Sequence, residues 1–201
     1  MLWLGKEYGV TRMAMGFNNH LGSDRADFEK CAEIGREIGI EVVAVGEYPA
    51  NGGVSSSKIR RLIAEGNVEA ANKFLGYRYG IAGRVVCGNQ IGRTIGFPTA
   101  NVKVDNTCVL IPGAGVYAAD VLLADGSRHR AVVNIGHRPT VDNTSALQIE
   151  AHILDFSGVI YGQKINISFI KRLRDERRFS DLTALRDQIA LDIAQARSLI
   201  M

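Results

Sequence analysis

Several features that mark common protein classes are scarce or missing in this chain of 201 residues. Its three cysteines, Cys31, Cys87 and Cys108, are scattered and form no C-x-x-C pair, which argues against a zinc site or a disulfide framework and favours a reducing, cytoplasmic setting. No apolar run approaches the roughly 18 residues that a membrane-spanning helix needs. The opening MLWLGKEYGV has no long apolar core, so we expect no signal peptide.

An excess of one charge is missing too. The net charge is only +3 and no long basic run occurs, so we expect no nucleic-acid partner. The absence of G-x-x-x-x-G-K-[ST] excludes a P-loop, and the absence of H-R-D and D-F-G excludes a protein kinase. A hydrophobic content of 46% nevertheless suffices for a sizeable core.

The first part of the chain has the periodicity of an α/β fold. Residues 10–15 form a candidate short strand, and residues 40–45 are a continuous apolar strand of the kind that a parallel sheet buries. Between them, residues 24–38 have helical spacing, with Gly39 placed to cap the helix end. A strand, a helix and a strand of these lengths predict one βαβ unit.

Two short helices are expected next, at residues 58–65 and 67–75 with Gly66 between them. From about Tyr79 the pattern changes, and GYRYG at residues 76–80 interrupts both periodicities. We therefore predict two domains, residues 1–78 and residues 79–201.

The second part has the pattern of a β-barrel. Residues 116–123 and 130–135 flank the turn sequence ADGS, which predicts a hairpin, and residues 147–154 and 165–170 alternate in the same way. Short strands at such intervals predict an antiparallel barrel. A final helix is expected after Ser180 as N-cap, with one apolar stripe formed by Leu182, Leu185, Ile189, Ile193 and Ala196.

The most informative stretch is GRVVCGNQIGRTIGFPTAN at residues 83–101. Glycines at this density let backbone N–H groups approach a polyanion closely; they are Gly83, Gly88, Gly92 and Gly96. Arg93 within the loop could meet phosphate or face solvent. A glycine-rich hairpin with a turn begun by Pro98 would explain the same residues without a ligand.

Thr99 and Asn101 lie two residues apart, so on an extended backbone their side chains point the same way. Two neutral, hard oxygens suit a Mg²⁺ ion that keeps several waters and bridges nucleotide phosphates. The pair therefore predicts a site for Mg²⁺ and ATP.

The pattern G-x-V-x-x-G…G-R-x-x-G-F-P-T-A-N resembles the riboflavin kinase signature. The resemblance continues in one register over roughly residues 80–201, through GVY at 115–117, N-I-G…P-T at 134–140, E-A-H at 150–152 and LRDE at 173–176. It implies a Greek-key-like antiparallel barrel, with ATP and riboflavin as substrates and FMN as product. The glycine stretch would then cradle the phosphates.

The resemblance also assigns roles to two charged residues. Glu150 shares one face of the strand at residues 147–153 with Gln148 and His152, and on pattern alone that face could simply be solvent-exposed. The family places its catalytic glutamate here, which implies that Glu150 is the general base. The arginine at the place of Arg174 lies by the flavin product in the family, although a charge run such as LRDERRF is more often a solvated linker.

A second phosphate-like motif, VSSSKIRR, occupies residues 54–61. Serines at a helix start, with cationic residues following, attract anions, although a plain N-cap explains them equally. The motif resembles I-S-S-T-x-I-R of cytidylyltransferase-like nucleotidyltransferases, which implies a residual phosphate site at Ser56, Ser57 and Arg60. Bacterial FAD synthetases join such a Rossmann-like domain to riboflavin kinase in this order, and residues 16–25 resemble a worn G-Y-D-H-x-F-G…R segment.

Those enzymes carry an H-x-G-H motif in their first βα units, and no such motif occurs in this chain. We therefore expect residues 1–78 to be a partial FMN adenylyltransferase domain, with adenylyl transfer lost. An incomplete sheet leaves self-association through its open edge as a protein partner. Two alternatives to a riboflavin kinase stay open: a complete FAD synthetase, and a flavin- or nucleotide-binding barrel without enzymatic activity.

Overall fold

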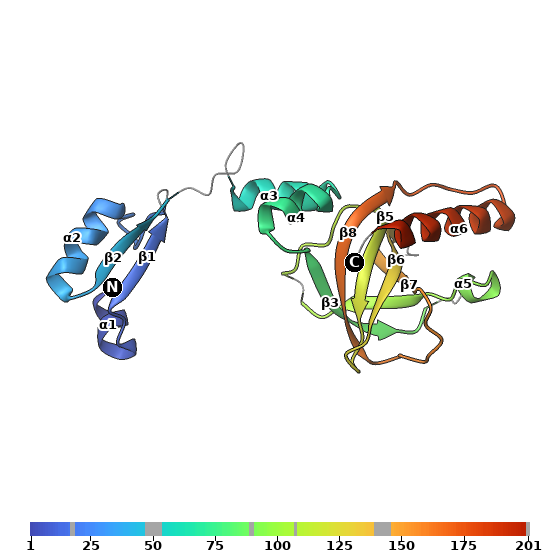
Figure 1. Ribbon diagram of the computed structural model, residues 1–201, viewed down its shortest axis with the longest axis horizontal. Helices are drawn as coiled ribbons and strands as arrows, with labels where there is room; N and C mark the ends of the chain where they lie inside the picture. The colour runs from blue at the N-terminus through green and yellow to red at the C-terminus, as the bar shows by residue number, and fades with distance from the viewer. Residues whose placement is uncertain (17–18, 47–53, 89–90, 107, 139–145, 200–201) are drawn as a thin grey trace. The chain divides into compact units, whose positions relative to one another are not determined.

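The computed structural model describes residues 1–16, 19–46, 54–88, 91–106, 108–138 and 146–199. They form two compact units, Met1–Val54 and Ser55–Met201, and each is described by itself (Figure 1). Phe17, Asn18, Pro139 and Thr140, which belong to the resemblances above, lie outside the described residues.

The first unit contains the predicted βαβ arrangement. Strand β1 (Arg12–Gly16) pairs in parallel with β2 (Glu41–Val45), and helix α2 (Phe28–Ile38) connects them (Figure 1). The helix begins later than expected because the Asp27 side chain caps it, accepting a hydrogen bond from the Lys30 backbone N–H over 3.0 Å. Helix α1 (Leu2–Tyr8) precedes β1 and was not predicted.

The core of this unit is small. Its buried apolar residues are Met15, Ala26, Cys31 and Ile40. Trp3 and Tyr8 of α1 and Val43 and Val45 of β2 are exposed. A two-stranded sheet with so little buried area is marginal by itself.

Helices α3 (Ser56–Ala64) and α4 (Val68–Leu75) confirm the expected helix pair, but they belong to the second unit. The Asn72 side chain donates to the Phe169 carbonyl over 2.9 Å and accepts from the Tyr79 N–H over 2.7 Å. These bonds join the helix pair to the following strands. The compact unit therefore starts at Ser55, earlier than the change of periodicity near Tyr79 that set the predicted domain boundary.

The second unit is built on a closed antiparallel barrel. Its six strands are β3 (Gly80–Val86), β4 (Ala100–Val104), β5 (Gly115–Leu122), β6 (Arg128–Arg138), β7 (Ala146–Ile153) and β8 (Lys164–Arg174). They pair in the order β3-β4-β7-β6-β5-β8, and the circle closes because β8 pairs with both β5 and β3 (Figure 1). Closure leaves the barrel without an open edge. A short helix, α5 (Ile91–Thr94), interrupts the connection from β3 to β4.

The barrel interior holds the main core. Tyr117 and Phe169 meet there edge to face with ring centroids 5.4 Å apart. Helix α6 (Leu182–Ser198) covers the outside of β5 and β6, where its Ala196 packs with Val116 and Val132. Its N-cap is Asp181 and not Ser180 as predicted, because the Asp181 carboxylate accepts from the Ala184 N–H over 2.8 Å.

None of the helices in the described part of the chain is long and apolar enough to cross a membrane.

Candidate functional site

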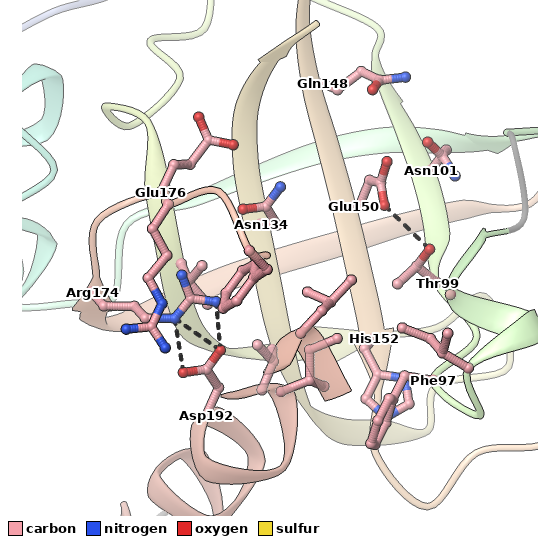
Figure 2. A pocket seen from close by; sticks show the side chains of 18 residues that line it. Phe97, Thr99, Asn101, Asn134, Gln148, Glu150, His152, Arg174, Glu176 and Asp192 are labelled. Carbon is pink, nitrogen blue, oxygen red and sulfur yellow. Dashed lines mark hydrogen bonds and ion pairs between the residues drawn. The ribbon is translucent and has the colours of Figure 1, made fainter. Parts of the chain in front are cut away.

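The barrel register brings the predicted catalytic and metal residues together. Strand β7 lies between β4 and β6, and Glu150 on β7 is paired with Asn101 on one side and Asn134 on the other. Thr99, just before β4, donates its hydroxyl to Glu150 Oε2 over 3.4 Å (Figure 2). A carboxylate, a hydroxyl and two amides therefore meet on one side of the barrel.

These side chains line a cavity of about 400 Å³. The strand side of the cavity contributes Thr99, Asn101, Asn134, Gln148, Glu150 and His152. The end of β8, helix α6 and the segment between them contribute Arg174, Glu176, Arg177, Phe179, Leu185, Ile189 and Asp192. Apolar rings and aliphatic side chains alternate with polar groups, as in a pocket for a mostly apolar ligand that is oriented by a few hydrogen bonds.

The four glycines predicted to bind phosphate do not gather at a single site. Gly92 lines the cavity, and Gly88 lies so close to Asn101 that a Cβ there would overlap the side-chain amide. Gly83 lies within β3, where a Cβ would come 2.6 Å from the Lys103 carbonyl oxygen, so its smallness serves the packing of two strands. Gly96 has a φ of 87° in the turn before Phe97. The Arg93 side chain lies outside what the structure describes.

Arg174 is held by a residue that the sequence reading missed. Its Nε donates to Asp192 Oδ1 over 3.0 Å, and its Nη2 donates to Oδ2 over 2.8 Å (Figure 2). Asp192 is only 2% exposed. The sequence does contain an indication of this role, because Asp192 is a charged residue within the apolar stripe of the last helix, between Ile189 and Ala196.

Other cavity residues shape the surroundings of Glu150. His152 Nδ1 lies 2.8 Å from the Pro98 carbonyl oxygen, and its ring meets Phe97 edge to face at 5.6 Å. This contact ties the Pro98 turn to β7 and so positions Thr99. The Glu176 carboxylate lies against Gly136, where a Cβ would overlap it.

A second cavity of about 400 Å³ shares Thr99 with the first. Its lining is largely apolar and comes from Val85, Pro98, Ala100, Ala151, Ile153 and residues 156–161, with the aromatic rings of Phe156 and Tyr161. Thr99, which donates to Glu150, is the residue common to both linings, so the two cavities come close to each other at Thr99. The sequence reading did not predict this second cavity.

The oxygen atoms near Glu150 fit a magnesium ion. The described residues contain no cluster of three or more histidine, cysteine, aspartate or glutamate side chains that could hold a metal. Thr99, Asn101 and Glu150 instead offer a few hard oxygens, which suits an ion that takes the rest of its ligands from phosphates and water. The close backbone of Gly88 holds the Asn101 amide in place.

The expected residual phosphate site lies elsewhere. Ser55 caps α3, accepting from the Lys58 N–H over 3.2 Å, while Ser56, Ser57 and Arg60 are exposed. None of these residues lines either cavity described above. Their role in adenylyl transfer stays a prediction.

Known proteins resemble this chain over almost its whole length. It is 36% identical over 193 residues to the bifunctional riboflavin kinase/FMN adenylyltransferase of Pseudomonas fluorescens, covering 95% of this chain and 61% of that protein. The equivalent protein of Escherichia coli strain K12 is 39% identical over 197 residues, covering 96% of this chain and 62% of that protein. The chain thus spans about three fifths of the length of these relatives.

A solved structure agrees with the fold. A crystal structure named as a macrolide-efflux protein from Streptococcus pneumoniae superposes with a TM-score of 0.88 at 32% identity, covering 98% of this chain and 64% of that one. The profile of the flavokinase family, described as riboflavin kinase, matches residues 75–200. That match includes the barrel, both cavities and Glu150, and on this evidence the chain belongs to the riboflavin kinase family.

Proposed function

We propose that this chain transfers the γ-phosphoryl group of ATP to riboflavin, giving FMN and ADP. The observation that carries the proposal is the convergence of Thr99, Asn101 and Glu150 in one cavity, with Thr99 also lining a second cavity. A transfer between two substrates needs separate donor and acceptor sites that open onto one reacting position. Family membership supplies the substrate class.

Riboflavin occupies the cavity that contains Glu150 in this proposal. Its ring system lies among the apolar side chains, with Phe97 and Phe179 as aromatic contacts. Its ribityl chain runs toward Glu150, where Asn134 and Gln148 present amide groups to the hydroxyls. Most of the lining is therefore matched to an uncharged acceptor.

Glu150 is the general base. Thr99 holds its Oε2 only by a long hydrogen bond of 3.4 Å, which leaves the carboxylate able to turn toward an acceptor hydroxyl. As the ribityl hydroxyl oxygen attacks the γ-phosphorus, its proton passes to Glu150 and the bond to ADP breaks. The chain contributes alignment and charge stabilisation, with no covalent intermediate.

ATP occupies the second, more apolar cavity. The aromatic rings of Phe156 and Tyr161 suit a purine base. Its phosphates then cross the turn at Pro98 toward Thr99 and Asn101. Thr99 and Asn101 would hold a Mg²⁺ ion, which would supply charge neutralisation at the phosphate oxygens.

A complete FAD synthetase is the second candidate, because the relatives named above are bifunctional. We favour FMN as the end product for this chain. The residues that would serve adenylyl transfer, Ser56, Ser57 and Arg60, are exposed and lie apart from both cavities. A barrel that binds flavin without turnover is the third candidate.

One incubation separates the three. The purified chain is mixed with riboflavin, ATP and Mg²⁺, and the flavins are resolved by chromatography. Conversion to FMN alone supports the proposal. FAD in the products supports the bifunctional enzyme, and bound but unchanged riboflavin supports a binding module.

A further inference from the structure

We call the cavity that contains Glu150, assigned above to riboflavin, the acceptor cavity. Its α6 side contains a carboxylate, Asp192, that the proposed reaction does not use. Asp192 is 2% exposed, and every oxygen of its side chain is occupied. Oδ1 accepts from Arg174 Nε over 3.0 Å and from Gln188 Nε2 over 2.7 Å, while Oδ2 accepts from Arg174 Nη2 over 2.8 Å. Burying such an ion pair in place of apolar side chains is often no gain in stability, so its presence needs another explanation.

The pair also occupies Arg174. Besides Nε and Nη2, its Nη1 donates to the Asp175 backbone carbonyl over 3.0 Å. The planar guanidinium is therefore fixed against α6 and its own chain, and its charge is balanced by Asp192. An arginine bound in this way is poorly available as a receptor for a phosphate group.

Backbone geometry places Arg174 where the barrel meets α6. Along the pairing of β5 with β8, Tyr117 lies opposite Arg172 and Val116 lies opposite Arg174, so Leu173 is an extra residue. Such a bulge redirects the side chains around it. Here it brings Arg174 to the α6 side of the cavity (Figure 2).

The segment that follows is held by the same face of α6. Arg177 donates to the Gln188 side chain, and Gln188 donates in turn to Asp192. The guanidinium carbons of Arg174 and Arg177 lie 5.6 Å and 4.9 Å from the centroid of the Phe179 ring, which lines the cavity. Gln188 and Asp192 of α6 therefore hold the two arginines that contact the Phe179 ring, which forms one wall of the acceptor cavity.

We propose that Asp192 is a positioning residue for the acceptor cavity. Through Arg174 and Gln188 it holds residues 174–179 against α6 and fixes the Phe179 ring beside the acceptor. Arg174 acts through this pair and does not contact the transferred phosphate. The inference rests on the proposed function for the identity of the ligand, riboflavin.

A mutant cycle tests it, with riboflavin affinity measured by flavin fluorescence in the absence of ATP. Arg174→Met and Asp192→Leu each break the ion pair that holds residues 174–179, and each should weaken riboflavin binding by about tenfold or more, since breaking one partner of such a pair is strongly unfavourable. The double variant should bind riboflavin no more weakly than the weaker of the two single variants, because both substitutions remove the same hold on residues 174–179. An Asp192→Leu variant with wild-type affinity, or losses in the single variants that add up in the double variant, would show that Arg174 contacts the ligand independently of Asp192 and would overturn the proposal.

The matched control is another ion pair on the same helix. Arg197 binds Asp155 over 2.7 Å, but their side chains are 56% and 73% exposed and neither lines the cavity. Arg197→Met with Asp155→Asn, which suits the φ of 56° at that residue, should leave riboflavin affinity within about twofold of wild type, because exposed pairs contribute little. An equal loss in this control would mean that α6 responds to any charge removal, which contradicts a specific role of Asp192.

A second measurement tests the proposal even if the variants above fold poorly or wild type does not bind riboflavin. Asp192→Asn keeps the shape and one acceptor, and amide hydrogen exchange of residues 174–179 is compared with that of β6 in the ligand-free chain. Faster exchange confined to residues 174–179 is expected, and unchanged exchange there would overturn the proposal. If wild type forms no FMN, the proposed function is refuted. Riboflavin affinity and hydrogen exchange are both measured without ATP, so neither depends on turnover.

Discussion

Replacing Glu150 with glutamine removes the proposed base while keeping almost the same volume. Strand β7 is paired through its backbone with β4 and β6, and these bonds do not depend on the carboxylate. The side-chain bond that is altered is the 3.4 Å contact from Thr99, which an amide oxygen can still accept. We therefore expect the melting temperature and the riboflavin Kd to stay close to those of wild type.

The chemical step should suffer much more. Loss of a general base typically lowers kcat by about 10²–10⁴-fold, which corresponds to about 3–5 kcal/mol of activation free energy. The assay is FMN formation under saturating ATP and Mg²⁺, with flavins separated by chromatography. Glu176→Gln is the matched control, because Glu176 is a second carboxylate of the same cavity but lies against Gly136, and it should cost far less in kcat. A kcat for Glu150→Gln within a few-fold of wild type would remove Glu150 from the mechanism.

Three further predictions concern the metal, the donor cavity and the first unit. Thr99→Val and Asn101→Leu each lose an oxygen ligand, so Mg²⁺ titrations of FMN formation should shift to higher concentration by about tenfold or more, while riboflavin Kd changes little; unchanged titrations would refute the metal assignment. Phe156→Ala should raise the KM for ATP and leave riboflavin Kd unaltered, and the reverse pattern would exchange the two cavities. Residues 12–45 should exchange amide hydrogens faster than the barrel strands, because few apolar side chains are buried there, and uniform protection in a monomer would contradict this.

Local patterns in the sequence were enough for most of the elements, although not for helices α1 and α5. The βαβ unit, the helix pair around Gly66 and the short alternating strands are all present in the structure. The periodicity of apolar residues and the capping residues determine these features, because both act within a few residues of the chain. The spacing of Thr99 and Asn101 likewise predicted two side chains on one face, since alternate residues of a strand point the same way.

The partners of these residues were decided by the tertiary structure. Alternation says which face a residue occupies, but it does not say which strand will pair with it, and only the barrel register places Asn101 and Asn134 on either side of Glu150. The same limit explains Asp192, whose polarity in an apolar stripe was visible while its partner, Arg174, lies on another element.

The helix pair and the glycines also separate what the local sequence predicts from what the tertiary structure decides. Nothing local in residues 56–75 indicates that Asn72 will bond to Phe169 of β8, so the compact unit begins earlier than the change in periodicity. The glycine stretch predicted close backbone approach, which occurs at Gly83 and Gly88, but against a neighbouring strand in one case and against Asn101 in the other. Sequence determined where the backbone could come close, and the pairing of distant strands decided what it came close to, because closing the barrel requires contacts between residues far apart in the chain.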